Sequence, residues 1–278
     1  MIQSKSYGKL LTSMPPGFEI SSRFFWQAEE LLGQGLFLLG KEERRRDAFM
    51  DTLLDTMLKC HAMEYHIGNF LALESEFLAH VESGPQGSFR SHALLFEVEA
   101  FLFQLKSALD VGVKLLGILV PNRFRVKTFE DKGMALRRAL AQYQKDASAK
   151  KDLTAHLSAM LQDDREVWLE RAIDLRDQVS HYRTLADFEY LGVNHDGRCS
   201  LRTPTILGVT PVAFLRTTYQ NCIEFLQDFM CLSIGMSLPS TFTVGLRTGP
   251  TRFGDPIAQY IKFGLGFLQE DASNNSGE

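Results

Sequence analysis

Apolar residues recur every three or four positions along much of the chain, the spacing that places them on one face of an α-helix. Within residues 89–118 they cover a helix almost all round, which predicts a central position in a helical bundle. The same periodicity predicts further helices over residues 18–39, 47–82 (as one long or two short helices), 131–145, 150–180 and 210–235. The last of these should start at Thr210, because Pro211 suits a first helical position.

The pattern changes after His181, where apolar and polar residues begin to alternate. Alternation indicates strands with one face buried, and it predicts strands over residues 186–193 and 198–203. The four residues between them, Asn-His-Asp-Gly, are typical of a hairpin turn. We therefore expect a mainly α fold, a helical bundle with a small β-hairpin after the helix that ends near His181.

Three regions follow from this pattern. A loop rich in Gly, Pro and Ser ends at Ser88 and separates an N-terminal helical segment, residues 1–88, from the main bundle, residues 89–236. The N-terminal segment is expected to pack on the bundle, which contains the hairpin at about 186–203. Residues 237–278 form a C-terminal extension.

The extension carries weaker signals than the bundle. Its pattern favours a short strand over residues 242–246 and a short helix over residues 256–267. The last residues, 270–278, are acidic and polar, and we expect them to be disordered.

Composition narrows the classes of function. The 278 residues carry a net charge of −4, which argues against a broad basic surface for nucleic acid but leaves room for a local basic cleft. The four cysteines lack the spacing of a zinc or redox motif, so buried reduced thiols are expected. No apolar run is long enough to span a bilayer, and Met1–Met14 does not resemble a signal peptide. We expect a cytoplasmic protein without a membrane partner.

The densest group of chemically useful side chains lies at the end of the predicted helix 150–180. The helix should bury an apolar stripe made up of Leu161, Trp168, Ala172, Leu175 and Val179. Polar side chains then crowd together at Arg176, Asp177, Ser180, His181, Tyr182 and Arg183. On an ideal helix Arg176 and His181 lie about 140° apart. They can therefore meet only if the helix loosens near His181 or a second subunit completes the site.

A narrow polar strip also crosses the most apolar helix. Glu99, Lys106 and Asp110 fall within about 40° of one another on an ideal helix. Buried polar groups need partners, so two interpretations stand. Lys106 and Asp110 could form an ion pair that satisfies both groups, or the strip could orient Arg176.

Basic and aromatic residues alternate in the segment that follows Pro121. Arg123, Arg125 and Lys127 alternate with apolar residues and are followed by Phe129. Such interleaving can hold RNA by charge and stacking, whereas the simpler interpretation is a loop packed by its own phenylalanines.

The motif Leu175–Tyr182 resembles that of the HEPN superfamily (higher eukaryotes and prokaryotes nucleotide-binding). The family motif is an arginine, a polar residue and a histidine at the end of a bundle helix. Here these are Arg176, Asp177 (often asparagine in the family) and His181, with four residues between the arginine and the histidine. The segment Ser107–Asp110 looks like part of the helix that precedes the motif in bacterial HEPN-like proteins. The resemblance covers residues 90–236.

The resemblance implies a metal-independent endoribonuclease without a cofactor, acting as a homodimer whose motif helices line one cleft. The RNA 2′-OH would be the nucleophile. His181 would move protons, Arg176 would stabilise charge on the phosphoryl group, and Asp177 would orient His181 or hold the motif in shape. Ser180, Tyr182 and Arg183 would bind substrate.

A second function is compatible with the same resemblance, because many HEPN-like domains serve as non-catalytic modules. Such a module would dimerise and bind a nucleotide, RNA or a protein. The enzyme would fit a toxin or defence role, with an antitoxin protein as a further partner.

Overall fold

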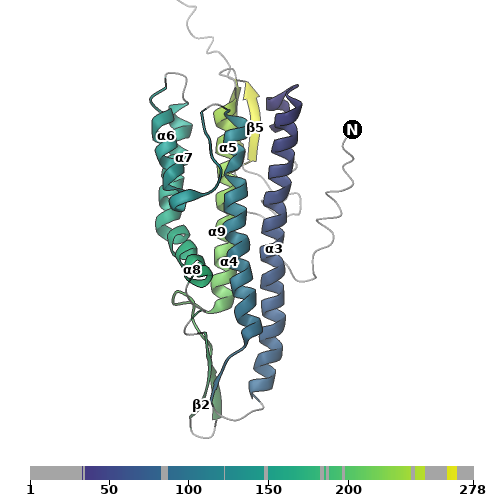
Figure 1. Ribbon diagram of the computed structural model, residues 1–278, viewed down its shortest axis with the longest axis vertical. Helices are drawn as coiled ribbons and strands as arrows, with labels where there is room; N and C mark the ends of the chain where they lie inside the picture. Colours follow the sequence, from purple (N-terminus) through teal and green to yellow (C-terminus); the bar gives the residue numbers. More distant parts are fainter. Residues whose placement is uncertain are drawn as a thin grey trace, which may run out of the picture.

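The computed structural model describes residues 33, 35–82, 87–121, 123–146, 150–181, 185, 188–195, 198–238, 242–247 and 262–267. The predicted mainly α helical bundle is confirmed (Figure 1). Its helical elements are α3 (Glu43–Glu82), α4 (His92–Gly112), α5 (Lys114–Leu119), the 3-10 helix η1 (Glu130–Gly133), α6 (Met134–Tyr143), α7 (Lys151–Asp164), the π-helical turn η2 (Arg165–Leu169), α8 (Glu170–His181) and α9 (Pro211–Ser237). None of the helices in these ranges is both long and apolar enough to cross a membrane.

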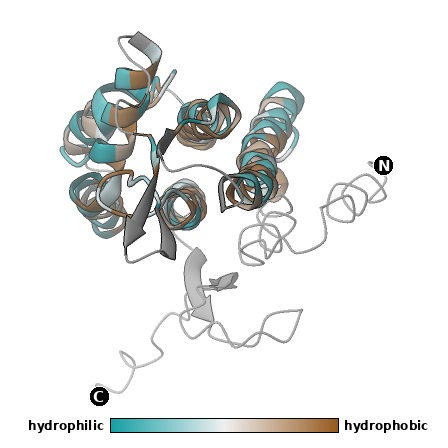
Figure 2. Ribbon diagram, turned by 90° about the horizontal axis from the view of Figure 1, so that it is seen from below, coloured by the Kyte–Doolittle hydropathy of each residue, from teal (hydrophilic) through white to brown (hydrophobic). Residues whose placement is uncertain are grey.

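The long helices α3, α4 and α9 run side by side along the length of the molecule, and α6, α7 and α8 cover α4 and α9 from one side (Figure 1). Figure 2 looks along the bundle and shows the helices end-on around a common interior. Residues 43–82 form one continuous helix rather than two. Because α3 packs against both α4 and α9, it is an integral wall of the bundle.

The starts of α4 and α9 follow from their capping residues. The Thr210 hydroxyl accepts a hydrogen bond from the Ala213 backbone N–H at 3.3 Å, with Pro211 in the first turn, as predicted. Ser91 caps α4 in the same way through Leu94. α4 contacts α3, α5, α8 and α9, which agrees with its predicted central position, but its buried side chains lie on one broad face, and Phe96 and Phe103 on the other side are exposed.

Aromatic side chains join the helices to the connecting segments. Phe225 of α9 packs edge-to-face on Phe129 and Trp168, with ring centroids 5.7 and 6.4 Å apart, and stacks on Phe229 at 6.0 Å. These contacts fix the segment after α5 and the turn η2 against α9. The same core therefore supports both the segment after α5 and the helix α8 that follows η2.

The predicted hairpin is present and gains a third strand. Antiparallel strands β2 (Tyr190–His195) and β3 (Arg198–Arg202) pair in the expected order, and β1 (Gly87–Phe89), which the sequence indicated only as a loop, pairs with β2. The buried Tyr190 donates a hydrogen bond to Glu74 Oε1 at 2.6 Å. This contact ties the sheet to α3.

One prediction for the C-terminal extension was wrong. The strand β4 (Phe242–Arg247) forms as expected, but its partner is a second strand, β5 (Lys262–Phe267), where a helix was predicted. Gly264 and Gly266 alternate there with Phe263, Leu265 and Phe267. Glycine disfavours a helix and alternation favours a strand, so the two-residue period was the relevant signal. Residues 256–261 and 270–278 lie outside the described residues.

Candidate functional site at the end of helix α8

The motif occupies the last turns of α8. The apolar stripe predicted for this helix is confirmed, because Leu161, Trp168, Ala172 and Leu175 are buried and Val179 packs on the core. The π-helical turn η2 interrupts the predicted helix and adds Leu169 and Ile173 to its buried side. A π turn accommodates an extra residue, so it rotates the face that follows.

The structure places Arg176, Asp177 and Ser180 together and His181 as the last residue of α8. The Ser180 hydroxyl donates to the Asp177 carbonyl oxygen at 3.3 Å, so this hydroxyl serves the helix end in the described structure. The His181 side chain and the predicted substrate residues Tyr182 and Arg183 lie outside the described residues.

Two contacts hold the Arg176 guanidinium in a defined orientation. Its Nη1 donates to Asp177 Oδ1 at 2.9 Å, and its central carbon lies 5.2 Å from the centre of the Phe103 ring on α4. The side chain is 26% exposed, and its Nε is shielded from solvent without a hydrogen-bond partner in the described part of the chain. The guanidinium therefore has a fixed plane and a neighbouring negative charge, and its Nη2 makes no hydrogen bond among the described residues.

Lys106 and Asp110 form an ion pair one turn apart on α4. Asp110 Oδ1 also accepts a hydrogen bond from the Phe129 backbone N–H at 2.7 Å, which anchors the segment after α5 to α4. Among the described contacts, no hydrogen bond or ion pair joins either residue to Arg176. The geometry thus supports the first of the two interpretations for this pair.

Glu99 lies one helical turn from Phe103 on the same side of α4. Burial raises the pKa of its carboxyl group. Within the described residues it has no hydrogen bond or ion pair, to Arg176 or to any other side chain. Its role in orienting Arg176 stays a prediction.

A strained turn links α8 to the segment after α5. Asp131 and Lys132 have φ angles of 49° and 51°, a region that non-glycine residues seldom adopt. The turn sends Lys132 to Asp174 and Glu170, and the pairing with Asp174 raises the pKa of Lys132. Sequence reasoning missed this connection, although Gly133 after two polar residues was a signal for a left-handed turn.

Sequence reasoning also missed a buried acid between α3 and α9. Glu64 is 1% exposed, and its Oε1 accepts a hydrogen bond from the Tyr219 hydroxyl at 2.5 Å. Burial raises the pKa of Glu64 to about 7, while the Tyr219 hydrogen bond opposes the shift. The second oxygen has no hydrogen bond in the described structure and lies 3.7 Å from His61 Nδ1.

The segment after α5 is packed by its phenylalanines, as the simpler interpretation predicted. Phe124 and Phe129 are buried, whereas Arg123, Arg125 and Lys127 are exposed. The ring of Phe124 meets the ring of Tyr143 edge-to-face at 5.1 Å. Packing therefore accounts for the aromatic residues and leaves the cations on the surface.

No cluster of three or more His, Cys, Asp or Glu side chains in the described ranges could hold a metal ion. Comparisons with protein-family models, with curated proteins and with solved structures find no match to this chain. The likeness to the HEPN superfamily therefore rests on the residues of the α8 motif and their position at the end of a bundle helix.

Proposed function

We propose that the protein is a HEPN-like, metal-independent endoribonuclease that acts as a homodimer. The observation that carries the proposal is the fixed position of Arg176, held between Phe103 and Asp177 one turn before His181. An immobilised guanidinium whose Nη2 has no hydrogen-bond partner among the described residues is suited to bind a phosphoryl oxygen, because little freedom is lost when it does so.

The chemistry uses the nucleophile that RNA itself carries. His181 removes the proton of the 2′-OH, the 2′ oxygen attacks the phosphorus, and the P–O bond to the 5′ oxygen of the next nucleotide breaks while that oxygen takes a proton from water. The products are a 2′,3′-cyclic phosphate and a 5′-hydroxyl end. Arg176 stabilises the negative charge that develops on the phosphoryl oxygens.

Asp177 keeps Arg176 in place until the substrate arrives. The carboxylate side chain is 46% exposed, and an exposed ion pair of this kind contributes roughly 0–1 kcal/mol. A phosphate group, which accepts two hydrogen bonds from one guanidinium, can replace it at little cost. Asp177 thus acts as a positioning residue.

A second subunit would solve the geometry of the motif. Arg176 and His181 lie about 140° apart around an ideal helix, so one copy of α8 does not direct both groups to one point. Pairing two copies of α8 across a two-fold axis would let Arg176 of one subunit work beside the His181 of the other.

The test is cleavage of purified transfer RNA and total RNA in EDTA by the wild type, Arg176→Ala and His181→Ala. Both variants should lose at least about a hundredfold in rate, the scale for removing a group that acts on the transition state. Arg171→Ala, an exposed arginine of the same helix, is the matched control and should keep full activity. Wild-type cleavage should leave cyclic-phosphate ends, and variants as active as the wild type would refute the proposal.

The second candidate is a non-catalytic HEPN-type dimeric module that binds a nucleotide, RNA or a protein such as an antitoxin. It is favoured by the surroundings of Arg176, whose charge is compensated by Asp177 and which stacks one turn from Glu99, an acid with no partner among the described residues. In that case no RNA is cut, and sedimentation should show a wild-type dimer that Arg176→Ala weakens. Toxicity on overexpression that His181→Ala relieves would favour the enzyme instead.

A further inference from the structure

Charge is unevenly distributed along the chain. Residues 121–150 contain eight Lys and Arg side chains against three Asp and Glu, a net charge of +5. The remaining residues carry a net charge of −9, since the whole chain carries −4. The small net charge of the protein therefore hides a strongly basic segment, which includes the exposed part of the chain between α5 and α6.

Packing turns these cations outward. Phe124 and Phe129 are inserted into the core, and a side-chain carbon at Gly117 of α5 would come within 3.1 Å of the Phe124 carbonyl oxygen. The segment therefore lies tightly along α5. Arg125 and Lys127, the residues between the buried positions, can only face solvent.

Several basic side chains of the segment form ion pairs with acidic side chains. Arg123 pairs with Asp146, Lys132 pairs with α8, and Arg138 pairs with Asp131. Arg125, Lys127 and Lys145 are different, because in the described part of the chain none of their side chains has an acidic partner or a hydrogen bond. These three exposed cations, which we call the free cations, are available to an anionic ligand.

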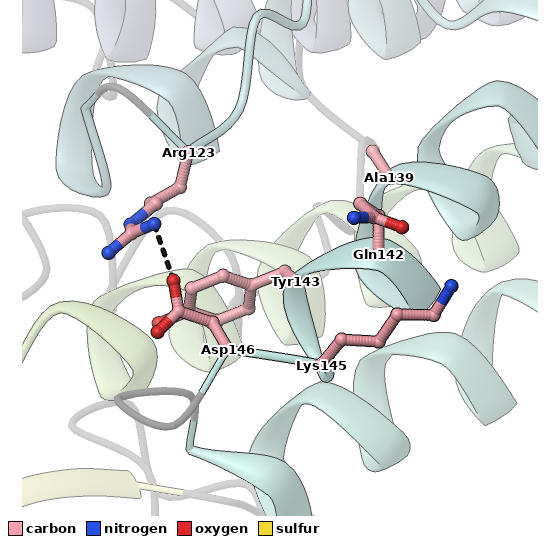
Figure 3. Close-up of a pocket in the computed structure, with 6 residues that line it drawn as sticks. All are labelled: Arg123, Ala139, Gln142, Tyr143, Lys145 and Asp146. Carbon is pink, nitrogen blue, oxygen red and sulfur yellow. Dashed lines mark ion pairs between the residues drawn. The ribbon is translucent and has the colours of Figure 1, made fainter.

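One of the free cations, Lys145, lines a cavity of about 480 Å³, and Arg123 of the same basic segment lines it as well. In Figure 3, Arg123 and its ion-pair partner Asp146 stand on one side, Gln142 and Lys145 on the other, and the Tyr143 ring between them. The Lys145 ammonium group and the Gln142 amide provide donors for phosphate oxygens, and the Arg123 guanidinium becomes a third donor when a phosphate replaces Asp146 as its partner. The lining therefore offers donors to a phosphate group, with one carboxylate to displace.

We propose that the cavity and the free cations form a contact surface for the phosphate backbone of single-stranded RNA. The inference rests on the proposed function, because it assigns a second contact to the same substrate. About 39 Å of helix, the 26 residues from Lys151 to Arg176, separates this surface from the motif along the chain. The surface therefore binds substrate away from the reacting group and takes no part in bond cleavage.

The experiment measures binding without cleavage. A fluorescent single-stranded RNA with 2′-O-methyl sugars lacks the 2′ nucleophile, and its affinity is measured by anisotropy at several salt concentrations in EDTA. The wild type is compared with the triple variant Arg125→Gln, Lys127→Gln and Lys145→Gln. The control is Arg44→Gln, Arg171→Gln and Arg216→Gln, which removes the same charge from exposed sites elsewhere.

The triple variant should bind roughly ten- to a hundredfold more weakly, and its dependence of log K on log salt should be shallower by about 2, since each lost contact to a single strand contributes about 0.7. The control variant should bind like the wild type. The thermal midpoint of the triple variant should be unchanged, because the three side chains are exposed and have no acidic partner in the described ranges.

Equal binding and equal salt dependence of the wild type and the triple variant would overturn the inference, as would an equal loss in the control or no wild-type binding. Failure of the proposed function is distinguishable. If RNA binding depends on the free cations but no RNA is cleaved, the proposed nuclease activity is refuted and the contact surface is retained. If cleavage depends on His181 but RNA binding does not depend on the free cations, the contact surface is refuted and the proposed nuclease activity is retained.

Discussion

The two cationic regions of the molecule differ in what surrounds the charge. At the end of α8, Arg176 is stacked on Phe103, paired with Asp177 and one quarter exposed. Between α5 and α6, Arg125 and Lys127 are exposed and without acidic partners among the described residues. The end of α8 therefore provides one guanidinium with a fixed orientation, and the segment between α5 and α6 provides net positive charge.

The difference shows why a motif and a charged surface should be tested separately. A guanidinium with a fixed plane can act on one phosphoryl group, but its neighbouring carboxylate limits its long-range attraction for RNA. Free cations attract a polyanion over a Debye length without aligning it for reaction. The proposed ribonuclease would need both properties, and the two regions lie on separate elements of the fold.

The largest expected effect separates rate from binding. Arg176→Ala should lower kcat for RNA cleavage by about a hundredfold or more with a small change in KM. Lys145→Ala should raise KM by a few fold and leave kcat unchanged, because a lost binding contact acts equally on substrate and transition state. Steady-state kinetics on one RNA in EDTA measures kcat and KM for both variants. A lower kcat for Lys145→Ala would contradict the division into a reacting region and a binding region.

The next effect concerns Glu64, the buried acid between α3 and α9, outside both cationic regions. Glu64 stays protonated in the folded protein up to a pKa of about 7, whereas in the unfolded chain it ionises from about 4.5. Its contribution to stability is therefore complete below pH 4.5 and is lost as the pH rises to about 7. Glu64→Gln should be near neutral at pH 4.5 and stabilising by about 2–3 kcal/mol at pH 8.

Urea unfolding at both pH values measures this change. In the Glu64→Gln variant the amide oxygen can keep the Tyr219 hydrogen bond, and the amide nitrogen can donate to His61 Nδ1, which lies 3.7 Å from the present oxygen. Glu76→Gln, at an exposed position of the same helix, is the control and should show no such pH dependence. Equal stability of Glu64→Gln and the wild type at pH 8 would contradict the prediction.

A smaller effect should follow from removing the charge next to Arg176. Asp177→Asn keeps a side-chain oxygen for the guanidinium but deletes the negative charge. RNA should bind a few fold more tightly, in line with the roughly 0.2–1 kcal/mol of an exposed ion pair. Anisotropy with 2′-O-methyl RNA gives the affinity, and weaker binding would mean that Asp177 itself contacts the ligand.

The smallest effect tests the ion pairs that join the two regions. Lys132→Met removes the contacts to Glu170 and Asp174 and should lower stability by about 0.5–1 kcal/mol, because these pairs are partly exposed. Arg138→Met, whose pair with Asp131 is far more exposed, should leave the thermal midpoint unchanged. A larger loss of stability for Arg138→Met than for Lys132→Met would contradict this prediction.

Much of the bundle was predictable because helix formation and helix boundaries are local properties. Ser-, Thr- and Pro-containing starts, such as Thr210–Pro211, and the three- and four-residue spacing of apolar positions act within a few turns. The hairpin around residues 190–202 was predictable for the same reason. The strand β5 was missed because its alternating glycines and apolar residues were taken for a helix.

The candidate site likewise has local features that the sequence predicted and long-range contacts that it did not. The motif residues and their place at a helix end could be predicted, because they are adjacent in sequence. The stacking of Arg176 on Phe103 could not, because 73 residues separate the two side chains. The Glu64–Tyr219 hydrogen bond spans 155 positions, and no local pattern indicates such a pairing.

The sequence by itself determined the mainly α bundle, the hairpin and the group of candidate site residues from Arg176 to His181. Only the tertiary structure decided which cations are occupied and which are free, because that depends on the acids that packing brings near. It also decided that Lys106 and Asp110 pair with each other and that Phe124 and Phe129 point inward, leaving Arg125 and Lys127 on the surface. Local periodicity specifies elements, whereas the partners of each charge follow from contacts between elements distant in the chain.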